Sequence, residues 1–300
     1  MTPLLRSPAA WALALIIAAG AVVSGLDLSA YAGAAPVSVG VGLLISALVT
    51  GIAAALVRRS RLWDRHGAVI ALALAWGALA TPALIILCAD RTDDLMARLG
   101  WDAIADSVSG AWPEEIAKDL GVALISIAWW PRMRRPGDGL IIGLFCGLGF
   151  ELIETLVYGA AGALAHPSSD LAGALDSWHQ RELGLGAGLH AIICTAVAGW
   201  GLTTAMATGR RRHAALGVVA GFALHFAWNA DWPQSWAQPA LGVVYAVSLA
   251  ALVVCWRSAL RSCPPRSRAG GPDGPPHPGG GVPLGENAGG EGAQPPAGAR

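Results

Sequence analysis

Charged side chains are scarce in this 300-residue sequence. Asp, Glu, Lys and Arg make up 13% of the residues, whereas they make up about 25% of a typical soluble domain. Hydrophobic residues account for 54% of the chain, and several apolar runs reach the roughly 20 residues that a helix needs to cross a bilayer. The composition therefore excludes an ordinary soluble protein and predicts an integral membrane protein in contact with lipid.

Several motifs that would assign a chemistry are also missing. The five cysteines form no CxxC pair, so no disulfide framework is expected. The sequence has no HExxH zinc helix and no GxSxG serine elbow. Paired membrane aspartates are absent too, because Asp119 stands alone. The 20 basic and 20 acidic side chains balance, which argues against a nucleic-acid partner.

The apolar runs predict an all-α fold, a polytopic transmembrane bundle of about eight spans. No internal repeat is visible, so one membrane domain over residues 1–258 is expected, with a catalytic core at 112–230. Residues 259–300 are rich in Gly and Pro and predict a disordered cytoplasmic tail. The expected spans are Pro8–Leu26, Ala35–Val57, Gly67–Ala89, Pro113–Trp130, Leu140–Ala165, Gly184–Met206, Ala214–Ala230 and Gln238–Trp256.

Arginines mark every second connection between these spans. Because basic loops stay in the cytoplasm, this alternation predicts that both termini are cytoplasmic in a multi-pass plasma-membrane protein. One missed span would break the pattern, so it also supports an even number of helices. The basic connections hold Arg58, Arg59, Arg61, Arg65, Arg132, Arg134, Arg135, Arg210, Arg211, Arg212, Arg257, Arg261, Arg266 and Arg268.

Polar residues within the predicted spans gather on the fourth to seventh. Such residues are costly in lipid and are functional candidates by default. At 1.5 Å of rise per residue, all four helices place them in the outer half of the bilayer. This agreement in depth predicts one shared site, which contains Glu114, Glu115, Lys118, Glu151, Glu154, His190, His225 and Asn229.

The spacing within the fourth span suggests how its charges divide. Glu114 and Lys118 are four residues apart and can form an ion pair. Glu115 points about 100° away from Glu114 and is therefore expected to face the cavity. A purely structural ion pair at a helix end is the alternative interpretation for Glu114 and Lys118.

A cluster of carboxylates and imidazoles suits hydrolysis. A carboxylate in a low-dielectric pocket can act as general base toward water, and histidines can stabilise an oxyanion or bind a metal. Two histidines with one or two glutamates also suit zinc. The spacing alone leaves metal-bound and metal-free water as equal alternatives.

These residues resemble the motifs of the PrsW family of intramembrane proteases. The resemblance consists of Glu114-Glu115-x-x-Lys118, Phe150-x-x-x-Glu154, His190 and His225-x-x-Trp228-Asn229, in that order on successive helices. It covers roughly Trp112 to Asn229. The family is a distant relative of the CAAX-processing and bacteriocin-immunity membrane proteases.

The resemblance implies proteolysis of a membrane-anchored protein, such as an anti-sigma factor, from the extracytoplasmic side. It implies that the catalytic or metal-binding residues are Glu114, Glu115, Glu154, His190 and His225. Glu154, His190 and His225 would be the candidate zinc ligands, although a metal-free glutamate mechanism is equally compatible. Lys118, Glu151, Arg181 and Asn229 would support the site, and Arg181 matches an arginine often found before the first histidine.

The sequence departs from the family pattern at two places. Thr155 stands where Asn is common, and Glu151 is an additional acid to which the pattern assigns no role. Asp119 stands where CAAX-type relatives carry Arg, and their second motif ends in His rather than in a residue like Glu154. The latter two differences favour the PrsW side.

A second class of function also uses buried Glu and His. A transporter or proton relay fits the same cluster, but such proteins usually show repeats and broken helices at the membrane centre. The sequence shows neither feature, so we expect a protease. Glu115 is our expected general base, because Glu114 is the better placed partner for Lys118; the reverse assignment is the alternative.

Overall fold

The computed structural model describes residues 7–60, 62, 67–87, 89–130, 133–181 and 187–263. Residues 1–264 form one compact unit. Every regular element in the described residues is helical, which confirms the all-α prediction. Most of the predicted tail, together with Cys88, Arg61 and Arg65, lies outside the described residues.

Three long helices lie at the periphery of this unit. They are α1 (Pro8–Ala34), α2 (Pro36–Arg59) and α11 (Gln234–Arg261). Only 17% of the most apolar stretch of each is buried. Aliphatic side chains therefore cover their outer faces, as expected for helices that contact lipid.

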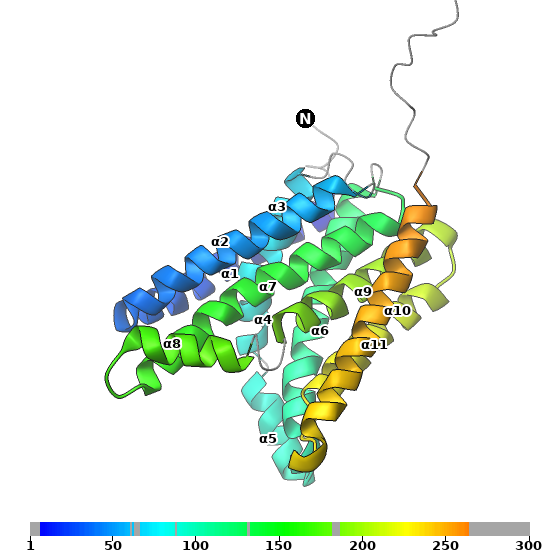
Figure 1. The fold of residues 1–300 in the computed structure, drawn as a ribbon. Coiled ribbons are helices and arrows are strands. Elements are labelled where there is room, and N and C mark those ends of the chain that lie inside the picture. Colours follow the sequence, from blue (N-terminus) through cyan, green and yellow to red (C-terminus); the bar gives the residue numbers. More distant parts are fainter. Residues whose placement is uncertain are drawn as a thin grey trace, which may run out of the picture. The chain divides into compact units, whose positions relative to one another are not determined.

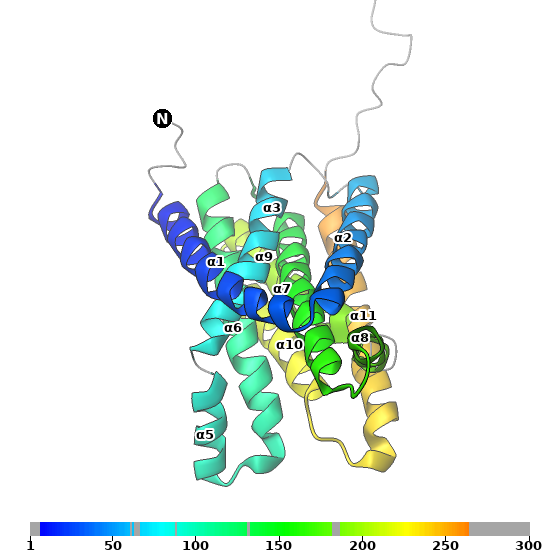
Figure 2. The same cartoon turned by 90° about the vertical axis from the view of Figure 1, so that its left-hand side faces the viewer.

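The centre of the unit is the pair α7 (Pro136–Ala165) and α9 (Ala187–Thr208), which pack along each other. Figure 2 shows them behind α1 and α2. In α7, 72% of the most apolar stretch is buried. The helices approach closely because Gly143 of α7 lies against the backbone of Thr195, where a Cβ would collide with the carbonyl oxygen.

The remaining elements complete the unit around this pair. Helix α6 (Ala105–Trp129) contacts both α7 and α9, and α10 (Arg212–Trp228) packs on α9. Figure 1 shows α5 at the end of the unit opposite the C-terminal ends of α2, α9 and α11. The shorter elements are α3 (Gly67–Ala75), the π-helical turn η2 (Trp76–Ala80), α4 (Thr81–Ile86), α5 (Ala89–Leu99), η3 (Asp102–Ile104) and α8 (Asp170–Trp178).

Six helices of the described chain are long and apolar enough to cross a membrane. They match six of the eight predicted spans. The other two predicted spans correspond to α6 and α10. Helix α6 carries a run of charges from Glu114 to Asp119, and α10 has only 17 residues, which is short for a span. The count of eight therefore stays a prediction.

Two predicted boundaries were wrong by several residues. Helix α1 continues past Leu26 to Ala34 and ends just before Pro36, which disfavours helical geometry in the preceding residue. Helix α6 begins at Ala105, so Pro113 lies inside it rather than in its first turn. Neighbouring helices and side chains allow proline inside such helices. At the other end of the chain, α11 continues past residue 259 to Arg261.

Candidate active site

A polar cavity of about 500 Å³ lies among α6, α7, α9 and α10. Four of the predicted catalytic residues line it, one from each helix: Glu114, Glu154, His190 and His225. Because these four residues lie on separate helices, the cavity is assembled only by the tertiary fold. Its other lining residues are Ile85, Asp106, Ser109, Gly110, Tyr158, Arg181, Ala191, Trp228 and Asn229.

Lys118 joins the two adjacent glutamates of α6. Its ammonium is fully buried and lies 2.6 Å from Glu115 Oε1 and 3.4 Å from Glu114 Oε2. Both contacts follow from helical geometry, since positions three and four residues apart share a face. One cation therefore offsets two acids in the interior, where an unpaired charge would be strongly destabilising.

The structure contains the expected ion pair of Glu114 with Lys118, but it does not place Glu115 at the polar cavity. Glu115 makes the shorter contact with Lys118 and is only 2% exposed. Glu114 instead lines the polar cavity. The prediction considered only the four-residue spacing, whereas Lys118 also reaches the glutamate three residues before it.

Glu115 also fixes the orientation of His225. Nδ1 of His225 lies 2.7 Å from Glu115 Oε1, and Nε2 lies 3.7 Å from Glu114 Oε2. A carboxylate that holds one ring nitrogen determines the tautomer and directs the other nitrogen. In this geometry Nε2 of His225 is the nitrogen left for a reactant in the polar cavity.

His190 is 1% exposed and is held on three sides. Trp228 stacks on its ring with 4.4 Å between centroids, and Cys194 Sγ lies 3.4 Å from Nε2. Nδ1 lies 3.2 Å from the hydroxyl of Ser248, which donates its one hydrogen to Val244 O. The hydroxyl of Ser248 therefore lies between the imidazole and the backbone of α11 and fixes the position of the ring.

Ser248 is a contact that sequence reasoning missed. It lies on α11, a span in which we expected no polar contribution to the site. A serine in an apolar helix usually bonds to its own backbone, and Ser248 does so. Ser248 is fully buried on a helix that is otherwise largely exposed, and the sequence of the span does not indicate this burial.

Arg181, in the segment after α8, joins the two glutamates of α7. Its Nη2 lies 2.6 Å from Glu154 Oε2 and 3.3 Å from Glu151 Oε2, and its guanidinium stacks over Tyr158. Thr155 donates to Glu151 Oε1 at 3.5 Å. Thus both departures from the family pattern, Glu151 and Thr155, contact each other beside Arg181.

Asn229 caps the end of α10 at the rim of the polar cavity. Its backbone N–H donates to His225 O at 3.1 Å. Its side chain packs on Gly110 of α6, where a Cβ would lie 2.5 Å from Asn229 Nδ2. The absence of a side chain at Gly110 therefore lets α10 deliver His225 and Asn229 close to α6.

The donor types around the polar cavity suit zinc, since they are imidazoles and carboxylates. However, no three His, Cys, Asp or Glu side chains among the described residues are placed to hold one metal ion. Glu154 pairs with Arg181, and both ring nitrogens of His190 have contacts. As the side chains lie, the candidate ligands do not form a metal site.

One comparison with known proteins finds a match that covers more than half of the chain. A family model described as PrsW family intramembrane metalloprotease matches residues 65–256. The match contains every charged residue of the polar cavity. No curated protein and no solved structure matches the chain.

Proposed function

Because the chain belongs to the PrsW family of intramembrane metalloproteases, we propose that its polar cavity hydrolyses a peptide bond of a membrane-anchored protein. The observation that carries this proposal is the pairing of Glu114 with His225 at the cavity wall. The 3.7 Å between Glu114 Oε2 and His225 Nε2 places a potential base and an imidazole beside the same reactant. Family membership also favours a protease over the transporter alternative.

In the proposed reaction Glu114 is the general base. Its carboxylate accepts a proton from water, and the hydroxide oxygen bonds to the carbonyl carbon of the scissile peptide. His225 is held by Glu115 through Nδ1, and an N–H at its Nε2 would donate a hydrogen bond to the oxyanion. When the C–N bond breaks, Glu114 returns its proton to the leaving amine. Lys118 offsets the charge of Glu114 and Glu115 throughout.

The family description implies a metal ion, and zinc is the ion that this donor set suits. In the metal-dependent alternative, Glu154, His190 and His225 would be the ligands, and His225 would then not be the donor to the oxyanion. When bound, zinc would supply a polarised water molecule at neutral pH. Because those three side chains are not arranged as a metal site here, the reaction above is derived from the residues of the chain alone.

We further propose that the enzyme lies in the plasma membrane with eight spans, of which α6 and α10 are two. The side that holds the C-terminal ends of α2, α9 and α11 would be cytoplasmic, because the basic connections lie there. The polar cavity would then lie in the outer half of the bilayer. An anti-sigma factor with one membrane span is the substrate class that we would test first.

The proposal is tested with purified protein in lipid vesicles and a panel of single-span anti-sigma-factor reporters. The wild-type chain should cleave at least one reporter, and Glu114→Gln should lower the rate by about 10²–10⁴, as expected for a lost general base. Asp102→Asn, an exposed acid outside the cavity, is the matched control and should not change the rate.

Addition of a chelator distinguishes a metal-dependent reaction from a metal-free one. Lost cleavage that zinc restores would support a metal-bound water, whereas unchanged cleavage would support a water activated by Glu114 alone. If Glu114→Gln and Glu154→Gln both cleave at the wild-type rate, the proposed site is wrong.

A further inference from the structure

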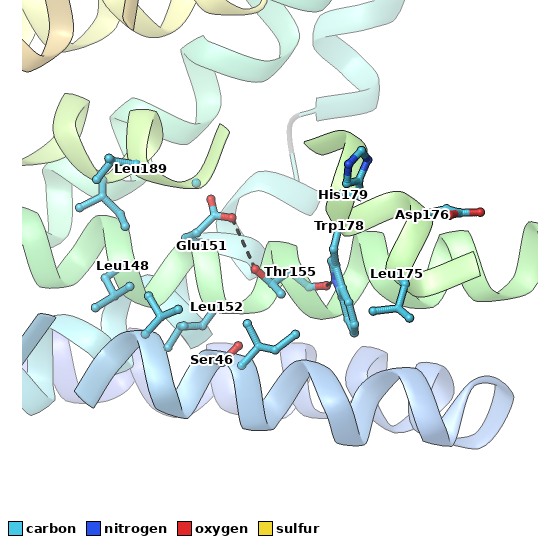
Figure 3. Close-up of a pocket in the computed structure, with 14 residues that line it drawn as sticks. Ser46, Leu148, Glu151, Leu152, Thr155, Leu175, Asp176, Trp178, His179 and Leu189 are labelled. Carbon is cyan, nitrogen blue, oxygen red and sulfur yellow. Dashed lines mark hydrogen bonds between the residues drawn. The ribbon is translucent and has the colours of Figure 1, made fainter. Parts of the chain in front are cut away.

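A second, larger cavity lies beside the polar one. It has a volume of about 710 Å³, is enclosed by α2, α7, α8 and α9, and is lined mainly by aliphatic side chains (Figure 3). This volume is within the range of pockets that bind small ligands, so it can hold a few side chains of a partner. We call it the apolar cavity; its lining is Ile45, Ser46, Val49, Leu148, Glu151, Leu152, Thr155, Leu175, Asp176, Trp178, His179, Gly188, Leu189 and Ile192.

The rim of the apolar cavity faces outward. Ile45 and Val49 of α2, Leu175 of α8 and Leu189 of α9 are exposed on the surface of the described chain. Exposed aliphatic side chains on membrane helices face lipid. The cavity is therefore reached from within the bilayer, which is where the membrane segment of an anchored substrate lies.

One polar side chain in this wall is buried without a partner in the described part of the chain. Ser46 is 6% exposed, and its hydroxyl has no hydrogen bond to any described residue. Figure 3 shows Ser46 on α2, on the side that faces α7. A buried hydroxyl without a partner is costly, and an acyl chain offers it none. Rotation of the Ser46 side chain toward the cavity that it lines would let a peptide carbonyl or N–H satisfy it, so the wall is better matched to a peptide than to a lipid tail.

One ion pair, Glu151 with Arg181, lies between the apolar cavity and the proposed active site. Glu151 lines the apolar cavity and contacts Arg181, which lines the polar cavity together with Glu154. A chain that occupies the apolar cavity would therefore place its next residues beside Glu154.

We propose that the apolar cavity binds the part of the substrate's membrane segment that adjoins the scissile bond. This inference rests on the proposed proteolysis. A peptide bond must leave its helix before it can be cleaved, and the freed backbone groups need partners inside the membrane. Aliphatic walls bind the side chains of this segment, and the Ser46 hydroxyl binds a freed backbone group.

The first test fills the apolar cavity and compares two substrates. Val49→Trp places an indole in the cavity wall, and Leu48→Trp is the matched control, because Leu48 is 65% exposed and does not line the cavity. The substrates are a single-span reporter that the wild-type chain cleaves and the soluble juxtamembrane peptide of that reporter. Leu189→Trp, on the opposite wall, repeats the test if Val49→Trp fails to fold.

Val49→Trp should lower kcat/KM for the anchored reporter by about tenfold, mainly through KM, and leave cleavage of the soluble peptide unchanged. Leu48→Trp should match the wild type on both substrates. Equal cleavage of the anchored reporter by all folded variants would overturn the inference while leaving the proposed function intact. If the wild-type chain cleaves no reporter of the panel, the proposed function itself fails.

The second test identifies the occupant. Benzoyl-phenylalanine is placed at position 49 or 48 of the inactive Glu114→Gln protein, in phosphatidylglycerol vesicles that contain the same reporter. Crosslinks from position 49, but not from position 48, to the membrane segment of the reporter are expected, and Ser46→Ala should reduce their yield. Crosslinks from position 49 to lipid alone would overturn the inference and identify an acyl-chain site.

Discussion

The two pairs of glutamates in the polar site are neutralised in different ways. Glu114 and Glu115 share Lys118, a cation one turn further along their own helix. Glu151 and Glu154 share Arg181, which comes from a separate segment of the chain. The α6 pair is therefore arranged as soon as the helix forms, whereas the α7 pair depends on how the segment after α8 docks.

Each pair also contains one glutamate at the polar cavity and one behind it. Glu114 and Glu154 line the polar cavity, whereas Glu115 and Glu151 do not. Glu115 holds an imidazole in place, and Glu151 faces the apolar cavity instead. The acids are one residue apart in α6 and three apart in α7, yet in both pairs one acid lines the polar cavity and the other holds a neighbouring group.

The largest expected effect is a difference within the α7 pair in cleavage of the single-span reporter. Glu154→Gln removes a carboxylate that lines the polar cavity and is a proposed zinc ligand. It should lower the cleavage rate by at least about 100-fold, because even a partner behind a metal ligand contributes about 10–100-fold. Glu151→Gln keeps the size of a residue that lies behind Arg181 and should lower the rate by about tenfold or less. Equal losses for the two variants would show that the α7 pair acts as a single unit.

The free energy of unfolding should depend more strongly on Lys118 than on Arg181. Lys118→Met leaves Glu115 buried without its cation and should destabilise the protein by about 3–5 kcal/mol. Arg181→Met should cost less, because the Arg181 side chain is 14% exposed and its partners Glu151 and Glu154 can be hydrated from the cavity. Thermal unfolding in detergent measures both. A larger loss for Arg181→Met would contradict the view that the α6 pair is the more deeply buried one.

Much of this arrangement follows from local rules that the sequence contains. Run length and hydropathy predicted a helical membrane protein, and six helices of the required length are present. The contact of Lys118 with the acids before it follows from helical spacing. The grouping of Glu114, Glu154, His190 and His225 followed from equal depth on four helices, and they line one cavity.

The remaining details depend on tertiary contacts. Which glutamate faces the polar cavity depends on the rotation of α6 against its neighbours. Spacing alone predicted Glu115, whereas Glu114 lines the cavity. The contact of Arg181 with Glu151 joins residues that are 30 positions apart, and that of Ser248 with His190 joins residues 58 apart. No periodicity along one helix encodes such contacts.

The two imidazoles of the polar cavity are also held in different ways. His225 is oriented by Glu115 of the α6 pair, whereas His190 is oriented by Ser248 and by no acid of the α7 pair. Loss of such a supporting partner typically costs 10–100-fold in metal affinity or activity, so Ser248→Ala should reduce reporter cleavage about tenfold. Ser248→Thr keeps the hydroxyl and should restore most of the activity, and Ser235→Ala, an exposed serine of the same helix, is the control. Full activity of Ser248→Ala would mean that Trp228 and Cys194 are sufficient to position the ring.

The smallest expected effect concerns Thr155, which stands where the family commonly has Asn. Its hydroxyl donates to Glu151 at 3.5 Å, the outer limit for a hydrogen bond, so the contact is weak. Thr155→Val keeps the shape of the side chain and should reduce stability by less than about 1 kcal/mol, with cleavage within about threefold of the wild type. Thr155→Asn should also retain activity, because an amide N–H can replace the hydroxyl as donor to Glu151.

Glu151 also has a closer contact with Arg181, at 3.3 Å. Arg181 is therefore expected to determine the position of the Glu151 carboxylate, and Thr155 is expected to change its orientation only slightly. A tenfold loss in Thr155→Val, with the stability unchanged, would contradict this and move Glu151 from support to the reacting centre.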